Sequence, residues 1–258
     1  MDTQELLAPR LLALGDAAWT VEFGREISAA VNARVMDLAE RIALLRQDDP
    51  LFATVSDLVP TFRSLTLHFD PLLTDAEALG ERLLALGQQA GSKLHEGRRW
   101  RLPVCFEGDF APDLPRLAEA KGLDQEAVIQ RLLEAEFRVY MIGFLPGFPY
   151  MGGLPPELAM PRLASPRQRV PANSLAVAGE MCAVYPWESP GGWNLLGRTP
   201  VQLFDLKQAG QPAMLAAGDR VRWYAVSRNE YEQLQQQIQG GALPRESFLQ
   251  AEDLTCPA

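Results

Sequence analysis

The stretch Trp100-Arg101-Leu102-Pro103-Val104-Cys105-Phe106 decides the fold class, because apolar side chains recur along it at every second position. Its four large apolar residues share one face, which is typical of a half-buried strand and places Cys105 on the opposite face. Shorter runs of the same kind follow at 138–142, 175–178 and 220–226. Many short strands indicate a mainly β domain, either a compact barrel or a sandwich.

The N-terminal part of the chain shows a different order of elements. The patterns predict a strand over 18–23, a helix over 28–45 and a strand over 62–69. Thr74 and Glu77 have the spacing of a capping box, in which each side chain accepts a hydrogen bond from the other residue's backbone N–H, and this predicts a second helix. The β-α-β-α order predicts a small α+β domain.

The polar, glycine-bearing stretch 91–99 marks the expected boundary between the two parts. We therefore predict an α+β fold with a small α+β domain over 1–95. A β domain follows over 96–240 and includes a helix over 124–137. Residues 241–258 are expected to form a loosely held C-terminal tail.

Composition limits the classes of partner. The chain has 258 residues, and 24 Lys plus Arg against 33 Asp plus Glu give a net charge of −9. This charge argues against a nucleic-acid partner or an anionic membrane surface, because neutralising phosphates requires a basic face. No apolar run reaches the roughly 18–20 residues that span a bilayer. The start, Met1 to Glu5, lacks the basic residues of a signal peptide, so we predict a cytoplasmic protein without a membrane partner.

Cysteine and histidine are too sparse for several kinds of chemistry. Cys105, Cys182 and Cys256 are widely spaced and include no C-x-x-C pair, so neither a disulfide framework nor a metal site is predicted. His68 falls on the polar face of a predicted strand and His95 in a predicted surface turn. Neither histidine is predicted to be a general base.

The segment 145–174 carries the first functional signal, because seven of its 30 residues are proline and three are glycine. Such a stretch is not a helix, and a long irregular segment inside a compact domain is functional or disordered. Its apolar residues argue against disorder, since they would be left in water. We interpret it as an ordered wall of a pocket; the alternative is a rigid loop that only packs on the β domain.

Three arginines in this segment, Arg162, Arg167 and Arg169, fall in an eight-residue window without an acidic residue. Guanidinium groups bind carboxylates and phosphates through two parallel hydrogen bonds, so the window indicates a small anionic ligand. The alternative is that each arginine pairs with a surface acid. Asn173 and Ser174 would add donors to the same space.

The second signal is the segment 185–200, which combines Gly191-Gly192 with three aromatic residues and several polar ones. Paired glycines allow a backbone to approach a ligand closely, and aromatic walls with a few polar groups are typical of small-molecule pockets. Aromatic residues beside glycine and proline turns are also ordinary parts of a core. Neither the P-loop motif nor the dinucleotide-binding glycine motif is present.

Both segments resemble one known family. The blocks Gly143-Phe144-Leu145-Pro146-Gly147-Phe148-Pro149-Tyr150, Ser189-Pro190-Gly191-Gly192-Trp193 and Leu196-Gly197-Arg198-Thr199-Pro200 are similar to the family of the bacterial 5-oxoprolinase B subunit. The family is also described as allophanate hydrolase subunit 1, carboxyltransferase subdomain C/D, or KipI-like. The similarity covers about residues 10–226.

The resemblance implies that the β domain is a cyclophilin-like barrel. It also implies a part in the ATP-dependent hydrolysis of 5-oxo-L-proline to L-glutamate, together with partner subunits A and C. ATP would come with Mg and would be held by this chain or by a partner subunit. An unreactive lactam requires activation of its carbonyl oxygen and donors for the negative charge that develops there.

The expected roles in that site follow from residue types. Arg169, Arg167 and Ser189 are the candidate catalytic residues. The candidate substrate-binding residues are Phe148, Tyr150, Arg162, Asn173, Ser174, Gly191, Gly192, Trp193 and Arg198. Asp113 is either an acid/base or, in a simpler interpretation, a residue at a helix start.

One departure from the family and two alternative functions stay open. Glu180-Met181-Cys182-Ala183 stands where the family commonly has Gly-Gln-Thr-Gly, so substrate choice could differ. One alternative is a KipI-like regulator that inhibits a sensor histidine kinase. The other is a carboxyltransferase-like component of urea or allophanate metabolism.

Overall fold

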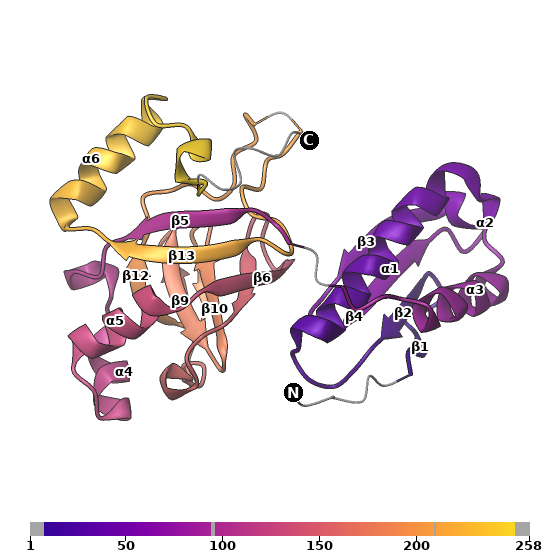
Figure 1. The fold of residues 1–258 in the computed structure, drawn as a ribbon, viewed down its shortest axis with the longest axis horizontal. Helices are drawn as coiled ribbons and strands as arrows, with labels where there is room; N and C mark the ends of the chain where they lie inside the picture. The colour runs from indigo at the N-terminus through magenta and orange to yellow at the C-terminus, as the bar shows by residue number, and fades with distance from the viewer. Residues whose placement is uncertain (1–7, 94–95, 209, 251–258) are drawn as a thin grey trace. The chain divides into compact units, whose positions relative to one another are not determined.

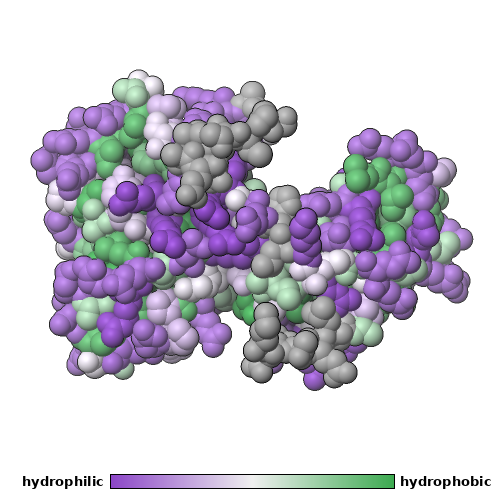
Figure 2. Space-filling model, in the orientation of Figure 1, coloured by the Kyte–Doolittle hydropathy of each residue, from purple (hydrophilic) through white to green (hydrophobic). Residues whose placement is uncertain are grey.

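The computed structural model describes residues 8–93, 96–208 and 210–250. The chain folds into two compact units, residues 1–95 and residues 96–258 (Figure 1). On the face shown in Figure 2, hydrophilic residues predominate and hydrophobic residues gather in small separate areas. No helix within the described ranges combines the length and the apolar character needed to cross a membrane.

The first unit is a four-stranded antiparallel sheet with the strand order β1-β2-β4-β3. Helix α1 contacts β3 and β4, and α3 contacts β1 and β2, so the two helices together cover the sheet. The elements are β1 (Arg10–Ala13), β2 (Ala18–Glu22), α1 (Ala29–Asp48), α2 (Pro50–Ala53), β3 (Val55–Pro60), β4 (Ser64–Phe69) and α3 (Ala76–Gln88).

Strand β4 shows why this sequence forms a one-sided sheet. Leu65, Leu67 and Phe69 are buried in the core of the unit, whereas the residues between them lie on the opposite face and are only half-buried. There the Thr66 hydroxyl lies 2.8 Å from the hydroxyl of Thr20 on β2. His68 lies on this polar face, so the predicted alternation is confirmed.

The predicted capping box at α3 is wrong. Asp75 is the N-cap, and its side chain accepts a hydrogen bond from the backbone N–H of Ala78 at 3.0 Å. The Thr74 hydroxyl instead donates to the backbone carbonyl of Asp70 at 2.6 Å. Thr74 is therefore occupied by the preceding turn, and the short carboxylate beside it caps the helix.

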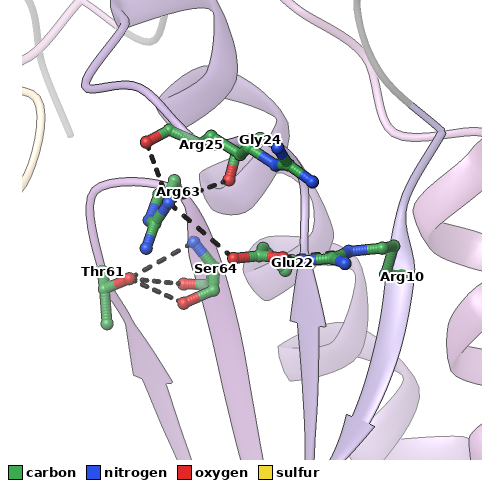
Figure 3. Close-up of polar contacts among 7 residues, drawn as sticks. All are labelled: Arg10, Glu22, Gly24, Arg25, Thr61, Arg63 and Ser64. Atoms are coloured by element: carbon green, nitrogen blue, oxygen red, sulfur yellow. Dashed lines mark hydrogen bonds and ion pairs between the residues drawn. The ribbon is translucent and has the colours of Figure 1, made fainter.

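A polar network ties the β1, β2 and β4 strands together at one end of this sheet (Figure 3). Arg10 donates from Nε to Glu22 at 3.1 Å across the β1–β2 pair. Arg63 donates from Nη1 to the backbone carbonyl of Arg25 at 2.8 Å and lies 3.8 Å from the other Glu22 oxygen. These contacts hold the turn after β2 against the start of β4.

The second unit is built on a seven-stranded sheet with the order β12-β9-β10-β7-β6-β13-β5. All neighbouring strands are antiparallel except β13 and β5, which run parallel. The strands are β5 (Arg99–Val104), β6 (Phe137–Ile142), β7 (Pro149–Gly152), β9 (Ser174–Ala178), β10 (Met181–Tyr185), β12 (Asn194–Arg198) and β13 (Arg220–Ala225).

Backbone pairing between the two ends of this sheet closes it into a barrel. Cys105, just after β5, and Arg198, at the end of β12, exchange both backbone hydrogen bonds at 2.9 Å. Trp100, Leu102 and Val104 point into the barrel core, as their period of two predicts. Cys105 is nevertheless fully buried, because it packs outside the barrel against Phe110 and Tyr231. The predicted α+β fold with a barrel is confirmed.

Helices and short turns surround the barrel. The predicted helix over 124–137 ends earlier than expected, because Phe137 already begins β6. Its N-cap is Asp124, whose side chain accepts from the backbone N–H of Ala127 at 2.6 Å. The remaining helical elements are η1 (Gly108–Phe110), α4 (Leu114–Lys121), α5 (Gln125–Glu134), η2 (Pro156–Leu158), α6 (Arg228–Gln239) and η3 (Arg245–Phe248).

The segment 241–250, which we expected to belong to a loose tail, packs on the barrel. Phe248 is buried, Leu249 pairs with Trp100, and the backbone N–H of Gln250 donates to the carbonyl of Arg99 at 2.9 Å. The apolar side chain at 248 explains this attachment, together with the start of β5, which the pairing of Cys105 with Arg198 leaves open. Residues 251–258 lie outside the described part of the chain.

The proline-rich segment 145–174 contains two strands as well as irregular backbone. Pro149 is the first residue of β7, and Pro171 directly follows β8 (Arg167–Val170). Proline is tolerated at these strand ends because no ladder hydrogen bond from its nitrogen is needed there. Strand β8 pairs with β11 (Ser189–Gly191), and this two-stranded ribbon joins the two segments that the sequence singles out.

Candidate functional site

Aromatic residues from both predicted functional segments gather in one cluster on the barrel. Phe148 is its centre, with ring centroids 5.1 Å from Tyr185, 6.0 Å from Trp193 and 4.8 Å from Tyr150. The chain therefore brings residues of the two segments together, as predicted. Phe148, Tyr185 and Trp193 are buried, and Tyr150 is half-buried.

Burial reinforces the neutral state of the two phenols in this cluster. It raises the pKa of Tyr150 and of Tyr185 above their ordinary value of 10, and the nearby Arg162 guanidinium opposes this only in part. Both hydroxyl groups stay protonated at neutral pH. Tyr150 is the more exposed of the two, so it is the better placed to donate a hydrogen bond to a ligand.

Asp113 lies beside the backbone of Trp193 and fixes the position of Arg167. The Nη2 of Arg167 donates to Oδ1 of Asp113 at 2.7 Å, and its Nη1 donates to the backbone carbonyl of Trp193 at 3.4 Å. The other oxygen of Asp113 accepts from the backbone N–H of Leu195 at 2.7 Å. Asp113 is at the N-cap of α4, yet its side chain makes no capping hydrogen bond.

Asn194 connects the proline-rich segment to the barrel. It is fully buried, and its amide nitrogen donates to the carbonyls of Pro161 and Val177, both at 3.0 Å. Its oxygen accepts from Arg116, a residue that sequence reasoning missed. Arg116 stands three positions after Asp113 on the same helix, and this spacing was the available signal. Asn194 therefore supports the wall instead of facing a ligand.

Two of the three predicted arginines flank the same tryptophan. The guanidinium carbon of Arg162 lies 5.8 Å from the centroid of the Trp193 ring, and Arg167 contacts the backbone of that residue. Arg162 is exposed and forms no ion pair with any described residue. Its charge is therefore available to an anion, with the half-buried Tyr150 5.9 Å from the same indole ring.

The third arginine is arranged differently. Arg169 lies on the β8–β11 ribbon, is 77% exposed, and pairs through Nε with Glu188 at 2.6 Å. Ser189, also on the ribbon, donates its hydroxyl to the carbonyl of Pro190 at 3.3 Å. The predicted catalytic roles of Arg169 and Ser189 stay predictions, because their present contacts are to neighbouring residues of the ribbon.

The paired glycines have unequal surroundings. A Cβ at Gly191 would overlap the hydroxyl oxygen of the buried Tyr185, whereas a Cβ at Gly192 would make an ordinary contact of 3.6 Å with Pro166. Gly191 is therefore required for the close approach of the ribbon to the aromatic cluster. The structure gives Gly191 a packing role that does not depend on a ligand.

The remaining predicted residues lie at the ends of β9 and β12. Asn173 has a positive φ of 62°, and Ser174 donates its hydroxyl to the carbonyl of Pro171 at 2.7 Å. The guanidinium of Arg198 lies 4.3 Å from the ring centroid of Phe110. Arg198 is thus engaged outside the Trp193 cluster, and its predicted role in substrate binding gains no support from these contacts.

Comparison with known proteins gives one family. Residues 9–215 match the model of the carboxyltransferase domain, subdomain C and D. The chain is 36% identical over 234 residues to the B subunit of 5-oxoprolinase from Bacillus subtilis (strain 168), and the match covers 84% of this chain and 93% of that protein.

Solved structures share the fold. The protein TTHA0988 matches with a TM-score of 0.69 and 37% identity over 81% of this chain, which spans only 40% of that longer chain. Urea amidolyase of K. lactis matches with a TM-score of 0.78 over 97% of this chain and 16% of that protein. Its sequence identity of 21% supports a shared fold alone.

Proposed function

The chain belongs to the family of the carboxyltransferase domain, subdomain C and D, and from this premise we propose that it is the B subunit of an ATP-dependent 5-oxoprolinase. In this proposal the assembled subunits hydrolyse 5-oxo-L-proline to L-glutamate, and this chain is inactive alone. The observation that carries the proposal is the 36% identity to a 5-oxoprolinase B subunit over 93% of that protein's length.

The cluster around Trp193 supports a substrate-binding role. The substrate is a five-membered lactam that bears a carboxylate, so it needs one cationic contact and a flat apolar wall. Arg162 and Arg167 supply guanidinium groups, and the half-buried Tyr150, beside the edge of Trp193, supplies the apolar wall. The phenol of Tyr150 would donate to the lactam oxygen as negative charge develops on it.

ATP and its Mg are better placed on a partner subunit. The sequence lacks both glycine-rich phosphate-binding motifs. Among the described residues, no group of three His, Cys, Asp or Glu side chains is arranged to hold a metal ion. In this proposal a partner subunit holds ATP and its Mg, and this chain binds and orients the lactam.

A partner surface is part of the proposal. Trp193 is only 4% exposed, so this chain alone offers an edge of the cluster and not an enclosed cavity. A subunit docked over Arg162 and Tyr150 would complete the enclosure and exclude water. The Bacillus relative is named as one subunit of a larger enzyme, which supports such an assembly.

The test is reconstitution from purified chains. This chain, mixed with subunits A and C from the same source, 5-oxo-L-proline and ATP, should yield glutamate, and omission of this chain should abolish it. Glutamate formed without this chain, or none formed with all three, would overturn the proposal. Inhibition of a sensor kinase's autophosphorylation by this chain, without glutamate formation, would support the KipI-like regulator instead.

A further inference from the structure

A hollow on the outside of the barrel is lined by residues of α6, of the segment 243–250 and of strands β5 and β13. In the ribbon, β5 and β13 run side by side and α6 follows β13 (Figure 1). The volume of the hollow is about 710 Å³, within the range of roughly 300–1,000 Å³ that small-molecule sites occupy. We call it the α6 cleft. Its lining residues are Arg101, Tyr224, Leu234, Gln237, Leu243, Ser247, Phe248, Leu249 and Gln250.

The floor of the α6 cleft follows from the barrel register. Strands β5 and β13 run parallel, with Leu102 opposite Trp223, and both of these side chains point into the barrel core. Their neighbours Arg101 and Tyr224 must therefore point outward. The guanidinium carbon of Arg101 lies 5.2 Å from the centroid of the Tyr224 ring, so the ring holds the guanidinium plane in place.

Arg101 keeps its hydrogen-bond donors free for a ligand. Within the described part of the chain, its guanidinium contacts the ring of Tyr224 and forms no ion pair, and no lining residue of the cleft is acidic. The neighbouring Arg222 shows the contrast, because its Nε pairs with Glu136 at 3.1 Å. On a chain of net charge −9, an unpaired guanidinium in a hollow without acids favours an anionic ligand.

The other lining residues indicate which further groups the ligand carries. Leu243, Leu249 and the buried Phe248 provide an apolar surface. The phenol of Tyr224 is a neutral donor at physiological pH, and burial raises its pKa further. The side chains of Gln237 and Gln250 make no hydrogen bond with other described residues, and each offers both a donor and an acceptor.

The hollow beside Arg10 in the first unit is less suited to an anion, because an acidic residue lines it. It has a volume of about 590 Å³, but Glu22 lies on its wall and accepts two hydrogen bonds from the Arg10 guanidinium. Of the two arginines in its lining, Arg10 is paired with Glu22, and the charge of Arg25 acts on the same carboxylate. This difference makes the α6 cleft the stronger candidate for a ligand site.

We propose that the α6 cleft binds a small organic carboxylate, with the carboxylate on Arg101 and a flat apolar body along Tyr224 and the leucines. A single guanidinium balances one negative charge. A phosphate dianion would call for more donors than one side chain supplies, and among the described residues neither a second cation nor a helix N-terminus lines the cleft. The site is separate from the Trp193 cluster and does not depend on the proposed reaction.

The test is a binding titration of the full-length protein with benzoate, followed by NMR. Benzoate should bind saturably, and benzamide, which is neutral, and phenyl phosphate should bind more weakly. Arg101→Gln should weaken benzoate binding by about tenfold or more, as expected for loss of a charged hydrogen bond. Ser247→Trp, which fills the cleft and leaves Arg101 in place, should also abolish binding.

Arg222→Gln is the matched control, because it removes the same charge from the position opposite Arg101 without touching the cleft. Its affinity for benzoate should equal that of the wild type. Benzoate binding that is absent, that survives Arg101→Gln, or that falls equally in the control would overturn the proposal. Tighter binding of phenyl phosphate or benzamide would overturn the carboxylate assignment.

Discussion

Arg167 and Asp113 are joined by a hydrogen bond of 2.7 Å from Nη2 to Oδ1, and this bond connects strand β8 to the start of helix α4. The carboxylate is only 7% exposed, and its second oxygen is held by the backbone N–H of Leu195. Asp113 therefore orients Arg167 next to Trp193. We infer that this pair fixes the geometry of the Trp193 cluster before any ligand arrives.

The first prediction concerns the contribution of this pair to stability. Asp113→Asn keeps the size of the side chain but removes its charge and one of its two acceptor oxygens. We expect the free energy of unfolding to fall by about 1.5–3 kcal/mol, because a buried charged hydrogen bond is lost. Urea denaturation measures this change.

Asp109→Asn is the control for that measurement. Asp109 also pairs with an arginine, Arg228, at 2.6 Å, but it is 69% exposed. An exposed pair contributes about 0–1 kcal/mol, so this variant should be nearly neutral. If both variants lose the same free energy of unfolding, the Asp113–Arg167 pair contributes no more than an exposed ion pair.

The second prediction separates the arginines of the proline-rich segment. In the reconstituted complex, Arg162→Ala should lower kcat/KM by about tenfold or more, because its unpaired charge faces the proposed substrate. Arg169→Ala should change kcat/KM by less than about threefold, in contrast to the catalytic role that the sequence suggested, because this arginine forms an exposed ion pair with Glu188. Steady-state kinetics on both variants decide between them, and the reverse ranking would refute the placement of the substrate.

The barrel could be predicted from sequence because its strands alternate clearly. The period of two from Trp100 to Phe106 identified β5 and the face that it buries. The closure of the sheet through Cys105 and Arg198 could not be predicted, because it depends on backbone groups alone. The packing of Phe248 on the barrel could not be predicted either, because a single aromatic residue in a polar segment forms no periodic pattern.

The site was predicted in part. The sequence indicated that the arginine window and the Trp193 turn would meet, and the contacts of Arg162 and Arg167 confirm this. It could not separate Arg167 from Arg169, which stand two positions apart on one strand, because their partners come from distant segments. Asp113 lies 54 positions before Arg167, and no local pattern connects such a pair.

The third prediction uses the paired glycines as an internal comparison. Gly191→Ala would place a methyl group against the Tyr185 hydroxyl oxygen, well inside van der Waals contact. The buried tyrosine has no room to retreat, so we expect a loss of about 1–3 kcal/mol in unfolding free energy. Gly192→Ala meets only Pro166 at 3.6 Å and should change stability by less than about 0.5 kcal/mol. Equal losses of stability for the two variants in chemical denaturation would show that the ribbon is not in close contact with the aromatic cluster at Gly191.

The fourth prediction concerns the acid sensitivity of the first unit. The hydrogen bond from Arg10 lowers the pKa of Glu22 below its ordinary value of 4.5 and outweighs the opposing effect of burial. Folding therefore favours the charged carboxylate, and this contribution is present above the unfolded pKa and lost as the pH falls through the folded one. The difference in unfolding free energy between wild type and Glu22→Gln should stay constant from neutral pH to about pH 5 and shrink below it. Arg10→Gln should make this difference depend less on pH, because the variant removes the hydrogen bond that lowers the pKa of Glu22. A difference that does not vary with pH in urea titrations would mean that Glu22 stabilises the unit by packing alone.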